Sequence, residues 1–194
     1  FDATQPLVTQ FGQATNRRGD VVLEIGFGGG EHLASLAEDN PAVNFIGAEP
    51  FVNGVASLLR HIQKRQLSNI RIWDDDVRLI LPALPLAGVS QVFIMFPDPW
   101  PKKRHAARRI LQPEMIDVLA QLIRPSGQLV LASDEPIAKG WLLQTAMSHP
   151  QFCWTACRPA DWRQRSPYLP ATRYMAKAEK ESRQPSWFIF ERRE

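Results

Sequence analysis

The amino-acid sequence predicts an α/β fold, in which a mostly parallel sheet carries helices on both faces. Between Asp20 and Pro150, short apolar runs alternate with amphipathic segments, which is the pattern of parallel strands joined by helices. Glycine, proline and acidic residues follow the apolar runs, as expected where a strand turns into the next element. The chain has 194 residues, of which 44% are hydrophobic and 22% charged, so we expect one globular domain over 1–194.

The first half of the chain contains three expected strands and two expected helices. A buried strand in VVLEIGFGG (21–29) runs into a glycine turn, and a helix over 31–40 stops at an Asn-Pro pair. A second strand in NFIGAEP (44–50) precedes a helix over 52–66, whose apolar residues share one face. The third strand, NIRIWDDD (69–76), ends in three acids. Every loop after a strand thus brings polar or glycine residues to the same edge of the sheet.

In the second half of the chain, strands and helices continue to alternate up to about residue 150, after which two strands follow without a helix between them in the sequence pattern. We expect a central strand at 89–99, a helix at 112–124 with Pro125 and Gly127 just past its end, and a strand at 127–135. A helix at 137–149 and two final strands at 152–159 and 186–193 should follow. The polar segment between the final strands is rich in Pro, Arg and Ser, and we expect a basic substrate-binding loop over 160–184. Cys153 and Cys157 have no second pair nearby for a zinc site, so we expect buried free thiols.

The charge of the chain is unevenly distributed. Residues 1–97 contain 7 Lys or Arg and 10 Asp or Glu, a net charge of −3, whereas residues 98–194 contain 16 and 10, a net charge of +6. This asymmetry suggests a polyanionic partner, and a solvated basic face is an equally good explanation from the charge alone. No apolar run approaches the roughly 18 residues of a membrane span, and the lead-in over 1–19, which we expect to be truncated, lacks a signal-peptide pattern. We therefore expect a cytoplasmic protein, either a monomer or a homodimer.

The glycine turn after the first strand indicates the kind of cofactor. Glycines at 26, 28 and 30 allow a sharp turn and close approach to a ligand. The dinucleotide fingerprint would need glycine where Glu31 stands, which argues against a nicotinamide oxidoreductase. The G-x-G-x-G spacing suits a nucleoside without a pyrophosphate. S-adenosylmethionine fits this description, and Glu24 would then face its sulfonium cation.

Acids also end the next three strands. Glu49 lies 25 residues after Glu24, close to the spacing of an acid that accepts hydrogen bonds from both ribose hydroxyls. One of the acids at 74–76 would meet the adenine amino group. Asp98 ends the central strand, so the reactive methyl group should lie near it. A glycine turn that binds nothing, and a plain turn role for Asp98, are the alternatives.

The chain resembles the bacterial tRNA guanine-N7 methyltransferase family in four stretches. These are, in order, EIGFGGGEHL, GAEP, FPDPWPKKRHAARRILQPE and a late TRY. The resemblance extends from about residue 20 to the end, and its FPDPW-x-K-x-RH-x-x-RR core is highly specific. It implies a class I methyltransferase fold, a Rossmann-like arrangement of seven mostly parallel strands with a C-terminal antiparallel strand. It also implies S-adenosylmethionine as methyl donor and the variable-loop guanosine of tRNA as acceptor, and it implies no metal.

The resemblance assigns roles position by position. Asp98 is the expected catalytic residue. The expected cofactor-binding residues are Glu24, Gly26, Gly28, Gly30, Glu49, Asp75 and Asp98. The expected substrate-binding residues are Lys102, Asp134, Thr172, Arg173, Tyr174 and Met175. The chain departs from the family at Met175, where a glutamate is usual. Either a guanine-facing carboxylate is missing, or Glu179 substitutes for it in a differently arranged loop.

The chemistry explains why the motif joins one acid to a basic run. Guanine N7 has a lone pair and no proton, so no strong general base is needed, and a fixed carboxylate at Asp98 would stabilise the charge that develops on the ring. Prolines on both sides restrict its backbone. The following cations would bind RNA phosphates. Trp100 is expected to pack under the loop rather than stack on a base. Two alternatives remain, namely a methyltransferase with another RNA or small-molecule acceptor, and a non-catalytic RNA-binding relative.

Overall fold

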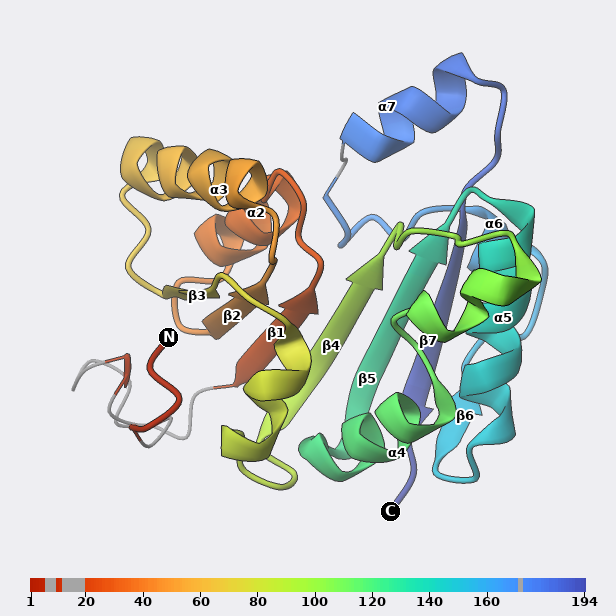
Figure 1. The fold of residues 1–194 in the computed structure, drawn as a ribbon, viewed down its shortest axis with the longest axis horizontal. Helices are drawn as coiled ribbons and strands as arrows, with labels where there is room; N and C mark the ends of the chain where they lie inside the picture. Colours follow the sequence, from red (N-terminus) through yellow and green to blue (C-terminus); the bar gives the residue numbers. More distant parts are fainter. Residues whose placement is uncertain (6–9, 12–19, 171–172) are drawn as a thin grey trace.

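A seven-stranded sheet forms the centre of the molecule (Figure 1). The computed structural model describes residues 1–5, 10–11, 20–170 and 173–194. The strand order is β3-β2-β1-β4-β5-β7-β6, and β7 is antiparallel to both its neighbours whereas the pairs among β1 to β5 are parallel. The strands are β1 (Val21–Ile25), β2 (Asn44–Ala48), β3 (Ile70–Trp73), β4 (Val89–Met95), β5 (Ile123–Ser133), β6 (Phe152–Trp154) and β7 (Ser186–Arg192). The predicted mostly parallel sheet with an antiparallel C-terminal strand is confirmed.

Helices cover both faces of this sheet, because alternate side chains of its buried strands point to opposite sides. On one face, Val22 of β1 and Phe93 of β4 pack with Leu33 and Leu58 under two helices. The opposite residues pack under the other two, with Leu119 and Leu142 among their contacts. The first pair is α2 (Glu31–Asp39) and α3 (Val52–Arg65), and the second is α4 (Pro113–Leu122) and α5 (Pro136–Ser148). Figure 1 shows the two pairs on opposite sides of the sheet.

Three local features differ from the sequence-based expectation. The helix α4 ends at Leu122 and β5 begins at the next residue, so the predicted helix was too long at its end. The segment 160–184 is not only loop, since it contains α6 (Ala160–Arg163) and α7 (Arg173–Lys180). Both cysteines are exposed, so their predicted burial is wrong. Short 3-10 helices η2 (Val77–Leu79) and η3 (Leu81–Ala83) follow β3, and η4 (Lys103–Arg108) follows β4.

The topology places the candidate site. The chain leaves β1 towards β2 on one side, whereas β4 lies on the other side of β1, so a crevice opens at the carboxyl ends of β1 and β4. The loops after β1, β2 and β4 converge there, and α7 lies beyond the carboxyl ends of β4 and β5 (Figure 1). Among the described residues, no helix has the length and apolar character needed to cross a bilayer.

Candidate active site

A pocket of about 470 Å³ opens at the carboxyl ends of β1, β2 and β4. Its lining comes from the loops that follow these three strands and from the basic segment beyond β4. The lining residues are Ile25, Gly26, Gly28, Glu49, Pro50, Phe51, Met95, Phe96, Pro97, Asp98, Trp100, Arg108 and Ile110. The structure thus brings four of the predicted cofactor residues, Gly26, Gly28, Glu49 and Asp98, to one cavity.

The glycine turn forms one wall of the pocket. Gly26 and Gly28 have φ angles of 73° and 54°, in the left-handed region that residues with a Cβ disfavour. At Gly26 an added Cβ would meet no atom within 4 Å, so the space beside this backbone is open. Gly54, near the start of α3, packs closely against the turn, because an added Cβ there would lie 2.3 Å from the carbonyl oxygen of Gly28. The turn and the start of α3 are therefore in direct contact.

The Glu49 carboxylate joins these two elements. Its Oε2 accepts a hydrogen bond from the Gly28 amide at 2.9 Å, and its Oε1 accepts one from the Phe51 amide at 2.9 Å. The side chain is buried at the end of β2 and still lines the pocket. Each carboxylate oxygen has two acceptor positions, so each retains one for a ligand. This geometry is compatible with the predicted contact to ribose hydroxyls, which stays a prediction.

Glu24 is paired within the fold, and its predicted contact with the cofactor stays a prediction. It is buried in β1 and is not among the residues that line the pocket. Its Oε2 is 2.8 Å from Nδ1 of His32, a buried residue of α2 that sequence analysis did not single out. The His32 ring packs edge-on against Phe93, and its Nε2 has no hydrogen-bond partner within the described residues. The one sequence signal for this pair is the position of His32 as the second residue of the helix after the glycines.

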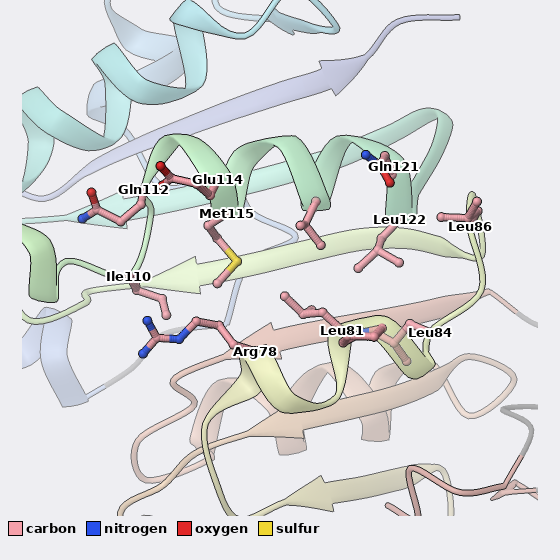
Figure 2. A pocket seen from close by; sticks show the side chains of 12 residues that line it. Arg78, Leu81, Leu84, Leu86, Ile110, Gln112, Glu114, Met115, Gln121 and Leu122 are labelled. Carbon is pink, nitrogen blue, oxygen red and sulfur yellow. The ribbon is translucent and has the colours of Figure 1, made fainter.

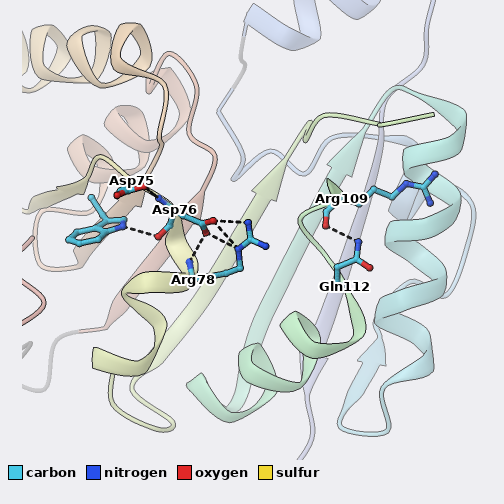
Figure 3. A network of polar contacts seen from close by, with 6 residues as sticks. Asp75, Asp76, Arg78, Arg109 and Gln112 are labelled. Atoms are coloured by element: carbon cyan, nitrogen blue, oxygen red, sulfur yellow. Dashed lines mark hydrogen bonds and ion pairs between the residues drawn. The ribbon is translucent and has the colours of Figure 1, made fainter. Parts of the chain in front are cut away.

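The acids after β3 also separate into different roles (Figure 3). Asp75 is exposed, outside the pocket lining, and its Oδ1 accepts from the Asp76 amide at 2.7 Å. Asp76 caps η2 and is held by the guanidinium of Arg78, with Nη2 to Oδ2 at 2.6 Å. The hydrogen bond from the Arg78 side chain lowers the pKa of Asp76 below its usual value. Asp76 is thus structural, whereas Asp74 and Asp75 are both exposed, and the predicted adenine contact of Asp75 stays a prediction.

The loop after β4 presents Asp98 to the pocket. Asp98 is exposed, and no hydrogen bond or ion pair of its side chain occurs with any described residue. Phe96 and Trp100, on either side of it, have φ angles of 53° and 39°. Non-glycine residues rarely adopt such angles, and clusters of them mark functional loops. Together with the two flanking prolines, this backbone fixes where the carboxylate can point.

Some cationic side chains of the basic segment after this loop face solvent, and others hold the fold together. Lys102 is exposed at the start of η4. Arg108 is exposed, and its guanidinium lies 4.9 Å above the ring centroid of Trp100. Arg109 is a structural residue, since its Nη2 donates to the Trp100 carbonyl at 3.3 Å and its backbone carbonyl accepts from Gln112 (Figure 3). Among the cations that follow Asp98, Lys102 and Arg108 thus face solvent, whereas Arg109 is turned inward.

The predicted substrate-binding residues near the C-terminus lie beyond β5. Asp134 follows this strand, and its Oδ2 accepts from Nε of Arg183 at 2.7 Å. Met175, in α7, is partly buried and packs against the apolar cluster on the α2 face. Thr172 lies outside the described residues, and so do the side chains of Arg173 and Tyr174. The Arg183 contact, which the sequence did not reveal, ties the segment 160–184 to the end of β5.

A second cavity, of about 460 Å³, lies between the 3-10 helices after β3 and α4 (Figure 2). Its lining is mainly aliphatic, with Leu81 and Leu84 on one side and Met115 and Leu122 on the other. Ile110 is the residue that it shares with the pocket at Asp98. None of the predicted site residues lines it.

Comparison with known proteins agrees with this arrangement. Residues 18–187 match the family described as "Putative methyltransferase". A tRNA (guanine-N(7)-)-methyltransferase of Paramagnetospirillum magneticum is 52% identical to the chain, covering 89% of the chain and 72% of that protein. The tRNA (guanine-N(7)-)-methyltransferase of Rhodospirillum rubrum is 48% identical, covering 88% and 67%. The chain belongs to this methyltransferase family. The resemblance that its motifs carry is thereby confirmed.

Solved structures show how widely the fold of this methyltransferase family is shared. The 16S rRNA methyltransferase KamB superposes with a TM-score of 0.66 at 18% identity, covering 98% of the chain and 95% of that protein. An rRNA methylase from Streptococcus thermophilus superposes with a TM-score of 0.61 at 12% identity, covering 98% of both chains. At such identities the likeness concerns the fold alone, and it confirms the predicted class I methyltransferase architecture.

Proposed function

We propose that this chain transfers a methyl group from S-adenosylmethionine to N7 of the variable-loop guanosine of tRNA. The observation that carries the proposal is the position of Asp98. Its carboxylate has no partner within the described residues and faces the cavity that Glu49 and the glycine turn also line. The names of the relatives at 52% and 48% identity support the same reaction.

The residues of the pocket fit S-adenosylmethionine. A volume of about 470 Å³ is in the range of small-molecule sites. Gly26 offers open space beside its backbone, where the nucleoside can approach closely. Glu49 keeps an acceptor position on each oxygen for the two ribose hydroxyls, and Asp75 is free for the adenine amino group. When bound, the cofactor supplies an electrophilic methyl group on a sulfonium, and its transfer leaves the guanine ring cationic.

Asp98 acts on the acceptor base. Because N7 carries a lone pair and no proton, the carboxylate is not required as a general base. It accepts hydrogen bonds from N1–H or the amino group of guanine, which orients N7, and it stabilises the positive charge that grows on the ring. The loop is held in place by Pro97 and Pro99, together with the left-handed backbone conformation of the residues beside them. The carboxylate is thus positioned before the base arrives.

The basic half of the chain supplies the contact with the RNA backbone. Lys102, Lys103 and Arg104 are exposed along the start of η4, next to the Asp98 loop. Each phosphate that such a side chain neutralises releases a counterion, so binding should weaken steeply with salt. The segment 160–184, which Arg183 fastens to Asp134, lies at the same edge and closes over the tRNA in this proposal.

The test is methyl transfer from labelled S-adenosylmethionine to unmodified tRNA transcripts, with the product base identified by mass spectrometry. The proposal expects N7-methylguanine from the wild-type chain and a loss of at least 100-fold in rate for Asp98→Ala, in line with removal of one transition-state contact. Unchanged transfer by Asp98→Ala would contradict the assigned role.

A different acceptor is the second candidate, and Met175 is the observation that favours it. The family's usual glutamate is replaced here by a side chain that packs against apolar residues. No transfer to tRNA by the wild-type chain, and no gain for Met175→Glu, would favour another RNA or a small molecule. Absence of S-adenosylmethionine binding in calorimetry would instead indicate a non-catalytic RNA-binding protein.

A further inference from the structure

Trp100 presents an indole ring to the same pocket as Asp98. The ring is only partly buried, whereas a tryptophan that packed beneath the loop would be fully covered. It is followed by Pro101, and its own φ of 39° lies in the left-handed region. A backbone strained in this way, next to the reacting centre, indicates that the direction of the side chain matters.

The position of Trp100 is set by a residue further along the chain. Arg109 donates from Nη2 to the Trp100 carbonyl at 3.3 Å, and its guanidinium lies 5.8 Å from the ring centroid of Trp141 in α5. On another side, the His105 ring meets the indole edge-on at 5.7 Å and 88°. The indole is thus held by its backbone carbonyl and by a perpendicular contact with the His105 ring.

Arg108 covers a face of this indole. Its guanidinium carbon lies 4.9 Å from the ring centroid, and both side chains line the pocket. Arg108 is exposed to solvent, and no ion pair holds it within the described part of the chain. A planar cation therefore rests on an aromatic face a few residues from Asp98, through a contact that is weak at exposed sites.

N7-methylguanine is a planar cation as well. We propose that the target guanine stacks on the face of Trp100 that Arg108 covers, and that the displaced guanidinium turns to a phosphate of the RNA. The proposal rests on the methyl transfer proposed above and assigns its guanine-binding surface. Aromatic faces stack on any base, and they attract a cation more strongly than a neutral ring.

If Trp100 stacks on the guanine, it should stabilise the transition state more than the bound substrate, which a residue that only packs under the loop would not do. As the methyl group bonds to N7, positive charge develops on the ring lying over the indole. The attraction then grows between the bound substrate and the transition state, which raises kcat rather than only lowering KM. The methylated product should also bind more tightly than the unmodified substrate, in proportion to the charge on its base.

The experiment compares Trp100→Phe and Trp100→Leu with the wild-type chain. Single-turnover methyl transfer is measured at fixed salt, together with tRNA affinity for an unmodified transcript and for the same transcript methylated at N7. Trp100→Leu should lower the rate on the order of 10- to 100-fold and abolish the preference for the methylated transcript. Trp100→Phe, which keeps an aromatic face, should retain most of both. Trp154→Leu, a packing tryptophan in β6, is the control and should leave both unchanged.

Arg108→Ala tests the second part of the proposal. Loss of one phosphate contact should reduce the slope of log affinity against log salt by about 0.7 to 0.9. An unchanged slope would contradict the displacement. Equal loss of melting temperature and of S-adenosylmethionine affinity in Trp100→Phe and Trp100→Leu would show a packing role and overturn the stacking surface. N7-methylguanine formation by the wild-type chain is measured first, so a failure of the reaction itself is recognised separately.

Discussion

Replacing Gly54 with alanine should disrupt the contact between α3 and the glycine turn. The added Cβ would lie 2.3 Å from the Gly28 carbonyl oxygen and 3.1 Å from Cγ of Glu49. Ordinary contacts begin at about 3.4 Å, so the turn or the helix must move by roughly 1 Å. Overpacking of this kind destabilises a fold by about 1–3 kcal/mol. Because the atoms that must move belong to the cofactor pocket, S-adenosylmethionine affinity should fall at least tenfold.

Gly140→Ala is the matched control. Gly140 lies inside α5, and an added Cβ there would meet no atom within 4 Å. Alanine is favoured over glycine in a helix interior by about 0.5–1 kcal/mol, so this variant should be more stable and bind the cofactor normally. Denaturant unfolding and calorimetric titration measure both quantities. Equal stabilisation of the two variants, with unchanged cofactor affinity, would refute the close approach at Gly54.

Three further predictions concern charged groups. Arg78 lowers the pKa of Asp76, so Asp76 contributes stability above its unfolded pKa that is lost as pH falls through the lower folded value. Asp76→Asn should remove this loss of folding stability at acidic pH. Because the pair is exposed, we expect the change in the free energy of unfolding to be under about 1 kcal/mol, measured by unfolding at a series of pH values. Arg183→Ala should speed hydrogen exchange in 160–184 and raise KM for tRNA, without changing cofactor affinity. Lys102→Ala should weaken tRNA binding and lower its salt slope by about 0.7 to 0.9 at unchanged melting temperature.

Local sequence patterns were sufficient to predict most of the fold. Buried parallel strands read as continuous apolar runs, so β1 and β4 were located correctly, and the glycines and acids after them were placed at one edge. The end of α4 was misjudged because Ile123 continues the apolar pattern of the helix while it already pairs with Val89 as a strand. The cysteines were misjudged because β6 is a three-residue edge strand, in which Cys153 faces solvent and beyond whose end Cys157 lies.

The site was only partly predictable. Glu49 and Asp98 were found because each ends a strand, and strand ends meet in a parallel sheet. The pairing of Glu24 with His32 of α2 was not predicted, because it joins a strand residue to a helix residue, and the predicted contact of Glu24 with the cofactor stays a prediction. The contact of Arg183 with Asp134 joins residues 49 positions apart, and no periodic pattern encodes such a pair. The cation over Trp100 depends on the turn of η4, which the proline-rich motif did not reveal.

The central claim is that N7 of a tRNA guanosine accepts the methyl group in the pocket at Asp98. The most direct measurement uses two tRNA transcripts, one with guanosine and one with 7-deazaguanosine at the variable-loop position, in single-turnover transfer of labelled methyl. The second base lacks only the N7 lone pair and keeps the N1–H and amino groups that Asp98 would bind. We expect both transcripts to bind equally and only the first to become methylated. Methylation of the 7-deaza transcript, or a product other than N7-methylguanine from the first, would contradict the account.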